Sequence, residues 1–412
     1  MLKQIYRRVV MILKPVISSL LSTDLYKFSM GQVYFHQFNK DKTKWSFKCR
    51  NTDVKFTPEM VDEIRAQIEH YCSLRFTEEE LEWLHKKQPW IHSDYCGFLR
   101  FWHPRAEEIT VKAEGPCGLS IEAEGSQVCV SYYEIPVLAI VNEVYFRMAY
   151  DYDVLYASFK RRLEEKISLL EKNEYETGVW SEFGMRRRLS DEAQDYLVKT
   201  LVERKLKGFA GTSNCFLAKK YGIKAVGTMA HEFIMTVGQG HHEYNPAYSN
   251  KFALDAWVKE YGILNGIALT DTITTDCFLR DFRLTYATLF SGVRHDSGDP
   301  YEWGEKMIRH YESLGIDPQT KTLLFSDSLD FRRATYIFRH FRGRAKIAFG
   351  IGTYLANDTD VKPLNIVMKV TEANGQPVAK VSDTPGKGMC KDSAYVDYLE
   401  RTIKWRLEHE AV

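Results

Sequence analysis

The sequence lacks the marks of membrane proteins, polyanion-binding proteins and disulfide-rich secreted domains. No apolar run approaches the 18 residues of a membrane-spanning helix. The 56 Lys and Arg residues are balanced by 55 Asp and Glu residues, so with a net charge of +1 no bulk field draws the chain to nucleic acid. The eight cysteines include no CxxC pair. We therefore expect reduced thiols and a cytoplasmic protein without membrane or nucleic-acid partners.

Several common catalytic motifs are also missing. The chain contains no GxGxxG, Walker A, GxSxG or HExxH pattern, and the pair His241-His242 with Glu243 lacks the i, i+4 spacing of helical metal ligands. These absences remove support for a nucleotide-fold dehydrogenase, a serine hydrolase and a structural zinc protein.

The length of 412 residues suits two or three domains, and pattern changes suggest their limits. Residues 1–20 form an N-terminal extension. Residues 21–150 are mixed, with helical patterns at 59–71 and 78–86 and strand-like runs at 108–113 and 127–132. Residues 151–361 form a catalytic domain. Residues 362–412, with a hairpin around Asn374-Gly375 and a charged tail, return to the mixed domain.

From about residue 206 the pattern becomes regular. Six short apolar runs end in glycine or polar residues, and most precede a helical pattern: GFAGTSN, KAVGTMAHE, GIALTDT, LFSGVRHDSGD, TLLFSDSLD and KIAFGIGTY. Strands that alternate with helices predict a parallel sheet, and six units in this length suit a barrel or partial barrel. Polar residues just after such strands share one face of the fold, where active sites are built.

Two of these strand ends have the composition of phosphate sites. GIGTY (350–354) offers backbone amides that can approach a phosphate, although a plain tight turn has the same composition. FSDSLD places Ser326 and Asp327 after another strand, where they can bind the same phosphate or cap the next helix.

Two charged segments are candidates for binding an anionic substrate. In GVRHDSGDP, Arg294 offers a planar fork for phosphate, and Asp296 and Asp299 suit a ribose diol or Mg²⁺. WSEFGMRRR (180–188) joins aromatic residues to three consecutive arginines, a run that otherwise forms a solvated basic face.

His231 is the candidate catalytic histidine because it follows the Gly-Thr end of the predicted strand in AVGTMAHEF. Glu232 is adjacent, but successive side chains diverge, so we expect a carboxylate distant in sequence to orient the imidazole. Asp271 in LTDTITTD is a candidate for the same face, although this segment lacks the glycine of a phosphoribosyl-binding loop.

Taken together and in this order, STDLYKFSM, WSEFGMRRR, GTSN, GTMAHE, GVRHDSGDP, FSDSLD and GIGTY resemble the nicotinate phosphoribosyltransferase family, from about Ser22 to Lys391. The resemblance implies a mixed α/β domain and an irregular, incomplete α/β barrel. It implies transfer of a phosphoribosyl group from 5-phosphoribosyl 1-diphosphate to nicotinate, with Mg²⁺ as cofactor and ATP as co-substrate. It also implies a homodimer with shared active sites.

The resemblance assigns roles to individual residues. His231 matches the family's autophosphorylated histidine. Phe183 and Arg186 match the residues that hold the pyridine ring and the phosphoribosyl donor, and Tyr26 matches an aromatic residue from the neighbouring subunit. The ribose and pyrophosphate region falls on Arg294, Asp296 and Asp299, the 5′-phosphate cradle on Ser326, Asp327, Gly350, Gly352 and Thr353, and the GTSN motif on Thr212 and Ser213. Arg186 to Arg188 can also supply a cation for the nicotinate carboxylate.

Two other classes stay open. A different phosphate-binding barrel enzyme, such as an aldolase or isomerase, needs a Schiff-base lysine or a carboxylate base at a strand end, and no lysine stands among the strand-end residues. A non-catalytic homologue used as a sensor or scaffold would be expected to lose His231 or the Arg294 segment, and both are present.

The residue after Gly211-Thr212 predicts the choice of pyridine. Related nicotinamide-using enzymes carry an Asp where this chain has Ser213. A carboxylate accepts a hydrogen bond from an amide but repels the nicotinate carboxylate. We expect the wild type to prefer nicotinate and Ser213→Asp to erode that preference, measured as the ratio of kcat/KM for the two pyridines. Equal kcat/KM values of the wild type would contradict this prediction.

Overall fold

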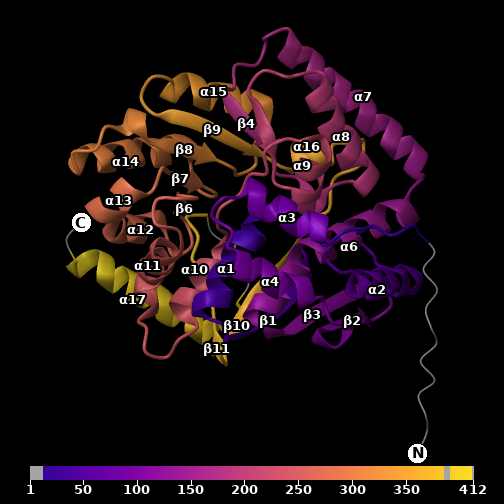
Figure 1. Cartoon of the computed structure of the whole chain (residues 1–412), viewed down its shortest axis with the longest axis horizontal. Helices are drawn as coiled ribbons and strands as arrows, with labels where there is room; N and C mark the ends of the chain where they lie inside the picture. Colours follow the sequence, from indigo (N-terminus) through magenta and orange to yellow (C-terminus); the bar gives the residue numbers. More distant parts are fainter. Residues whose placement is uncertain (1–12, 385–389, 411–412) are drawn as a thin grey trace, which may run out of the picture.

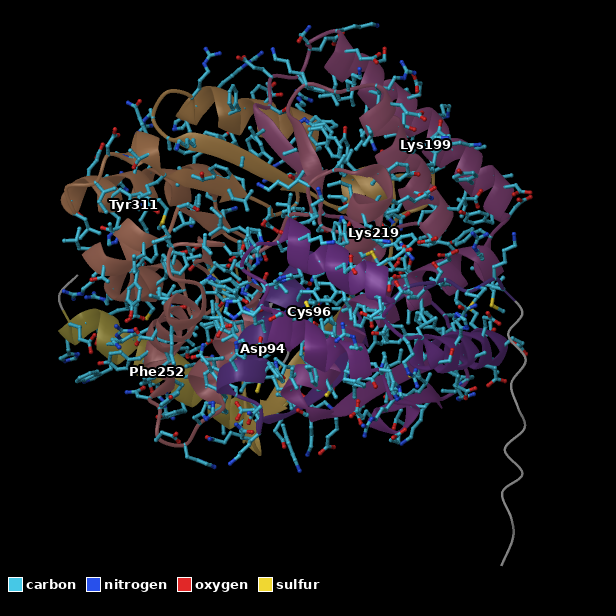
Figure 2. The ribbon with its side chains drawn as sticks, in the orientation of Figure 1. Asp94, Cys96, Lys199, Lys219, Phe252 and Tyr311 are labelled. Carbon is cyan, nitrogen blue, oxygen red and sulfur yellow. The ribbon has the colours of Figure 1, made fainter. Side chains whose placement is uncertain are left out.

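The protein is described by a computed structural model that covers residues 13–384 and 390–410. Its elements form two sheets that lie side by side, with side chains filling the space around them (Figures 1 and 2). The antiparallel sheet has the strand order β11-β10-β1-β3-β2. Its strands are β1 (Lys42–Cys49), β2 (Ile109–Glu114), β3 (Gly118–Ser126), β10 (Ile366–Ala373) and β11 (Gln376–Pro377).

The second sheet is parallel, as predicted, with the order β5-β4-β9-β8-β7-β6. Five of its strands are predicted runs: β5 (Phe209–Thr212), β6 (Ile267–Leu269), β7 (Gly292–His295), β8 (Thr322–Phe325) and β9 (Lys346–Ile351). The order ends at β5 and β6, and closure into an incomplete barrel stays a prediction. The structure thus has a mixed α/β fold with one parallel and one antiparallel sheet.

One predicted strand of the regular region is wrong. Ala225 makes only an isolated bridge to Thr212, because the chain turns away at Gly227, whose φ is +154°. The remaining strand is β4 (Val179–Glu182), which lies between β5 and β9 and comes from the segment noted for its aromatic residues and arginines.

The strand-like run at 127–132 is also wrong. It forms the short helix α5 (Gln127–Val130) followed by a 3-10 turn. Val128, Val130 and Tyr132 are all buried, and an apolar run buried on every side has no periodicity that separates a strand from a helix.

Helices of the N-terminal half surround the antiparallel sheet. They are α1 (Leu25–Gln37), α2 (Pro58–Ser73), α3 (Glu78–Lys87), α4 (Ser93–Phe101) and α6 (Glu134–Ala149). The predicted helices at 59–71 and 78–86 are confirmed as α2 and α3. The start of α1 is attached to the parallel sheet, because Leu25 N–H donates to the Ser213 carbonyl just after β5 at 2.9 Å.

The remaining helices accompany the parallel strands. They are α7 (Tyr152–Glu171), α8 (Asp191–Glu203), α9 (Cys215–Tyr221), α10 (His231–Gln239), α11 (Ser249–Tyr261), α12 (Thr275–Asp281), α13 (Leu284–Leu289), α14 (Pro300–Ser313), α15 (Phe331–Phe341) and α16 (Thr353–Ala356), and α17 (Ser393–His409) follows the hairpin. No helix within the described residues combines the length and hydropathy needed to cross a bilayer.

Residues near both ends of the described chain contribute to hydrophobic clusters. Residues 1–12 of the predicted extension lie outside the described residues, but Val16, Ile17 and Leu20 belong to the core. The hairpin around Asn374-Gly375 is confirmed and pairs through β10 with β1. In the tail helix α17, the buried Arg406 forms an ion pair with Asp281 of α12, and the assignment of this tail to the mixed domain stays a prediction.

Candidate functional site

Polar side chains gather at the carboxyl ends of the parallel strands. Because these ends lie along one edge of a parallel sheet, residues far apart in sequence become neighbours there. The residues at or just after the strand ends are Phe183 for β4, Thr212 and Ser213 for β5, Asp271 and Thr272 for β6, Asp296 for β7, Ser326 and Asp327 for β8, and Gly350 and Gly352 for β9.

His231, the first residue of α10, has partners from three segments. Its Nε2 lies 3.1 Å from Asp296 Oδ2 and 2.9 Å from Lys380 Nζ. Its Nδ1 lies 2.9 Å from the Thr272 hydroxyl. Lys380 Nζ also donates to Asp271 Oδ2 at 2.8 Å. As predicted, a carboxylate distant in sequence, that of Asp296, lies within hydrogen-bond distance of the ring.

Charges around His231 favour its neutral form. Burial and the Lys380 ammonium lower the pKa of His231 below its usual value, although Asp271 and Asp296 act in the opposite direction. Burial alone would raise the pKa of Asp296, but the His231 hydrogen bond and the charge of Arg294 hold it well below the usual range. At neutral pH the site therefore holds a neutral imidazole beside a carboxylate and an ammonium group.

Two other predicted residues lie around Asp296. The Ser326 hydroxyl donates to Asp296 Oδ1 at 3.0 Å, and Arg294 donates to the Met229 carbonyl just before α10 at 3.1 Å. Arg294 Nε is buried with no hydrogen-bond partner in the part of the chain that the structure describes. The structure thus brings together His231, Arg294, Asp296 and Ser326.

A buried ion network lies directly beside this group. Lys27 of α1 has a fully buried ammonium that contacts Glu134 of α6 at 2.7 Å and also contacts Glu232 of α10. Burial and the nearby charge of Glu134 raise the pKa of Glu232 to about 8, despite the opposing effect of Lys27. Arg186 donates to the other Glu134 oxygen at 3.4 Å. The network fixes α1, α6 and α10 around one cation.

Tyr26 lies beside this network in its own chain. Burial and the charge of Glu134 raise the pKa of the Tyr26 phenol well above its usual value, and Arg186 opposes this shift. Tyr26 and Arg186, two residues that the resemblance assigns to the substrate site, are thus close enough within one chain to interact electrostatically. The contribution of Tyr26 across a subunit interface stays a prediction.

Phe183 is held close to the end of β9. Its N–H donates to the Ile351 carbonyl at 2.8 Å, and its ring covers Gly350 so closely that a Cβ there would lie 2.3 Å from ring carbons. Gly352 faces the Phe183 carbonyl, and Thr353 begins the short helix α16. These glycines let the ring approach the strand, and their contact with a 5′-phosphate stays a prediction.

The hydroxyl groups after β5 have partners within the protein. Thr212 is fully buried and donates to Glu182 at 2.6 Å. Ser213 donates to Asp24 at 2.6 Å, so a carboxylate supplied by another segment stands beside Ser213. Burial raises the pKa of Asp24, while Ser213 and Arg186 act against that shift.

Two predicted aspartates have local contacts. Asp299 caps α14 and accepts hydrogen bonds from the N–H groups of Tyr301 and Glu302 at 2.8 and 2.9 Å. Asp327 accepts one from the Ser328 hydroxyl at 3.1 Å. The contact of either carboxylate with substrate stays a prediction.

The three consecutive arginines do not act together. Arg188 is fully buried, where it donates to the Val16 carbonyl at 2.9 Å and pairs with Asp191 at 2.7 Å. Arg187 donates to the Ile366 carbonyl of β10 at 3.2 Å. The expectation that Arg188 supplies a cation to the substrate is therefore wrong, because this side chain is committed to the core.

Cations concentrate around the site. Burial, followed by the charges of Lys380, Arg50 and Arg186, lowers the pKa of Lys369 to about 7. Burial and the charges of Arg186 and Arg50 lower the pKa of Arg187 to about 10. Mutually repelling cations in a buried position are stabilised by anions, which makes this region suited to anionic ligands.

Sequence reasoning missed Lys27, Glu134, Thr272, Lys369 and Lys380. Lys27 stands inside the motif STDLYKFSM, and its place next to Tyr26 is the sequence feature that could have marked it as a site residue. Lys380 follows the hairpin, and long-range contacts of its segment bring it to His231. Val381 N–H donates to the Thr272 carbonyl after β6 at 2.9 Å, and Ala379 N–H donates to Gln239 of α10 at 2.8 Å.

The fold and the site together define an α/β enzyme that acts on anionic substrates. Two family models match the chain: the nicotinate phosphoribosyltransferase (NAPRTase) family over residues 179–406 and its N-terminal domain over residues 21–142. The nicotinate phosphoribosyltransferase of Cupriavidus necator is 46% identical over 392 residues, which cover 94% of this chain and 98% of that relative. That of Chromobacterium violaceum is 44% identical over 400 residues, which cover 95% and 98%.

Solved structures agree with these matches. The nicotinate phosphoribosyltransferase of Vibrio cholerae has a TM-score of 0.87 at 35% identity, covering 95% of this chain and 96% of that one. That of Porphyromonas gingivalis has a TM-score of 0.86 at 35% identity, covering 94% and 100%. The chain belongs to the nicotinate phosphoribosyltransferase family.

The buried network predicts a large loss of stability when its cation is removed. Lys27→Met removes the cation that contacts both Glu134 and Glu232 and leaves Glu134 with only the longer contact to Arg186. We expect a loss of about 3 to 5 kcal/mol in the free energy of unfolding, measured with urea. Lys44→Met is the matched control, because Lys44 also contacts two glutamates but is 45% exposed. We expect a loss of about 1 kcal/mol or less there. Equal losses would contradict the assigned role of Lys27.

Proposed function

We propose that this chain transfers the phosphoribosyl group of 5-phosphoribosyl 1-diphosphate to nicotinate, and that it couples the transfer to ATP hydrolysis through phosphorylation of His231. The products are nicotinate mononucleotide and pyrophosphate. The observation that carries the coupled mechanism is the position of the His231 ring, whose Nδ1 contacts Thr272 and whose Nε2 lies beside Asp296 and Lys380.

The transfer needs charge stabilisation more than proton transfer. As pyrophosphate leaves the anomeric carbon, the ribose gains oxocarbenium character and the leaving group carries dense negative charge. The nicotinate nitrogen is unprotonated near neutral pH and needs no base. Arg294 and the cations around Lys369 suit the anionic groups, and a ring held between Phe183 and Tyr26 would be positioned for in-line attack.

The remaining assignments follow the family resemblance. Arg186, which is half-exposed beside Tyr26, would bind the nicotinate carboxylate. Asp296 and Asp299 would contact ribose and pyrophosphate. Ser326, Asp327, Gly350, Gly352 and Thr353 would hold the 5′-phosphate, since they lie at the ends of the neighbouring strands β8 and β9.

His231 is arranged as a nucleophile towards ATP. In the tautomer whose Nδ1–H donates to Thr272, Nε2 carries a lone pair and Asp296 lies beside it without accepting a hydrogen bond. This lone pair can form a P–N bond with the γ-phosphorus of ATP while the P–O bond to the β-phosphate breaks and ADP leaves. Lys380 then faces the transferred phosphoryl group. The added negative charge next to Arg294 and Lys380 would order the surrounding loops.

Carboxylates beside His231 fit a magnesium ion. Asp271 and Asp296 each have a ligand atom within 4.8 Å of the other and of a His231 nitrogen. Asp271 Oδ1 is buried without a hydrogen bond from any described residue. Oxygen atoms of this kind are what Mg²⁺ prefers, and when bound it would neutralise phosphate charge. We propose these two carboxylates as its protein ligands.

The proposed phosphohistidine predicts that ATP hydrolysis and transfer can be separated. His231→Asn should abolish nicotinate-dependent ATP hydrolysis and leave slow ATP-independent transfer, because the arginines and strand-end groups remain. ADP release and mononucleotide formation are measured for both proteins. Incubation of the wild type with γ-labelled ATP should give a protein-bound label that is stable at alkaline pH and lost in acid. His340→Asn, at an exposed histidine paired with Glu305, should behave as wild type. Absence of acid-labile label on wild-type protein during turnover, after a rapid quench, would exclude the mechanism.

We further propose a homodimer in which Tyr26 completes the neighbouring subunit's site. Tyr26→Ala and Arg294→Ala chains, each nearly inactive alone, should regain about a quarter of wild-type activity after subunit exchange, because half of the dimers are mixed and each has one complete site. A mixture of Arg294→Ala and His231→Asn is the matched control and should regain none, since both residues belong to one barrel domain. If Tyr26 instead acts in the site of its own chain, together with Arg186, the mixture of Tyr26→Ala and Arg294→Ala chains also stays inactive.

A further inference from the structure

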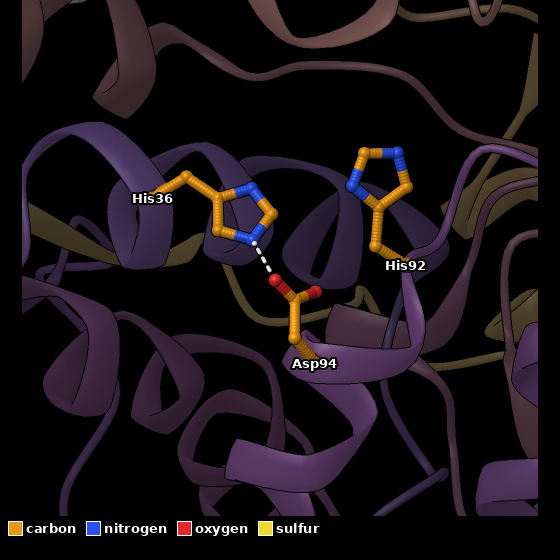
Figure 3. A group of neighbouring side chains, drawn as sticks. All are labelled: His36, His92 and Asp94. Carbon is orange, nitrogen blue, oxygen red and sulfur yellow. Dashed lines mark hydrogen bonds and ion pairs between the residues drawn. The ribbon is translucent and has the colours of Figure 1, made fainter.

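A second cluster of metal-ligand side chains lies on the N-terminal half of the protein. His36 in the last turn of α1 faces His92 and Asp94 at the start of α4 (Figure 3). One potential ligand atom from each of the three lies within 4.8 Å of the others. Asp94 is among the side chains that surround α1 and α4 in Figure 2. None of the three belongs to the site around His231.

The separation of two of these atoms suits a tetrahedral ion. His36 Nε2 and Asp94 Oδ2 are 3.1 Å apart. With metal–ligand bonds of about 2.0 Å, two ligands of a tetrahedral zinc ion stand roughly 3.3 Å apart. A ring nitrogen of His92 faces the same space (Figure 3), and the His36 and His92 ring centroids are 5.6 Å apart. Small side-chain rotations would bring all three atoms onto one ion.

A buried glutamate presets the tautomer of His36. Its Nδ1 lies 2.6 Å from Oε1 of Glu260, whose side chain is only 5% exposed. When Nδ1–H donates to this carboxylate, the Nε2 lone pair points at Asp94. Both ring nitrogens of His36 face carboxylate oxygens, so a cation between Nε2 and Asp94 would bind both of these atoms while Nδ1–H donates to Glu260. Metal-binding histidines commonly donate their other N–H to a carboxylate in this way.

Gln32 fixes the geometry of the cluster from beneath. This fully buried side chain accepts a hydrogen bond from His92 N–H at 2.7 Å and donates to the Trp90 carbonyl at 3.0 Å and to Glu260 Oε1 at 2.9 Å. Gln37 also donates to Glu260, at 3.2 Å. Gln32 therefore holds both the backbone of His92 and the Glu260 carboxylate that contacts His36.

We propose that His36, His92 and Asp94 bind one zinc-class divalent ion, with water in the fourth position. Two imidazoles and one carboxylate suit zinc and its neighbours better than magnesium or calcium. His92 and Asp94 are exposed, so the ion has direct access from solvent. The bound ion would tie α1 to α4, and because it binds only the folded chain it would raise stability without taking part in catalysis.

The experiment titrates the full-length protein with Co²⁺ as a spectroscopic probe and then with competing Zn²⁺. We expect tetrahedral visible bands that lack a thiolate charge-transfer band, and a rise in Tm with Zn²⁺. His92→Ala and Asp94→Asn, which change exposed side chains, should each weaken binding at least tenfold. Glu260→Gln should weaken it by roughly 10- to 100-fold.

Two controls make the result decisive. His340→Ala removes an exposed histidine that pairs with Glu305, and it should leave the affinity unchanged. His231→Asn tests whether the ion binds at the other His-carboxylate group, and it should also leave these bands in place. Bands that persist in His92→Ala, that vanish in His231→Asn or that show thiolate ligation would overturn the proposal. Absence of any saturable Co²⁺ binding would overturn it too, and the cluster would then be an ion pair alone.

Discussion

The buried ammonium of Lys27 is the constraint on which the arrangement of the site depends. An unpaired charge in the interior costs several kcal/mol, so this lysine requires both Glu134 and Glu232 within reach. The three residues come from α1, α6 and α10, and each helix also supplies or supports a residue of the site. Tyr26 precedes the lysine, His231 precedes Glu232, and Arg186 contacts Glu134. A change in the position of α1 or α6 would therefore separate the Lys27–Glu134 ion pair, and a change in the position of α10 would remove the Glu232 contact.

The site was predictable where function follows from local sequence and unpredictable where it depends on long-range pairing. Glycine and polar residues after apolar runs located five strands and the group of His231, Arg294, Asp296 and Ser326. Strand β4 is not predictable from local sequence, because four residues are too few to show a hydrophobic period and three arginines follow close behind. Lys369 and Lys380 were missed because a lysine in a hairpin gives no sign of what it faces.

Some residues that match family motifs have contacts that stabilise the fold of their own chain. Thr212 binds Glu182, Asp299 caps a helix and Gly350 leaves room for the Phe183 ring. A motif records that a residue type is needed at a position, but it does not distinguish contact with substrate from support of a neighbour. Arg188 makes the distinction plainest, since it adjoins Arg186 and Arg187 in sequence yet lies wholly in the core.

The pairing of β10 with β1 has a consequence for the synthesis of the chain. β1 is translated early, but its partner β10 begins at residue 366 and the lysine that contacts His231 stands at residue 380. A nascent chain on the ribosome therefore exposes one edge of β1 until nearly all of the protein has been translated. Such long sequence separation slows folding and leaves that edge open to wrong partners, so the growing chain has reason to depend on chaperones until its last segment emerges.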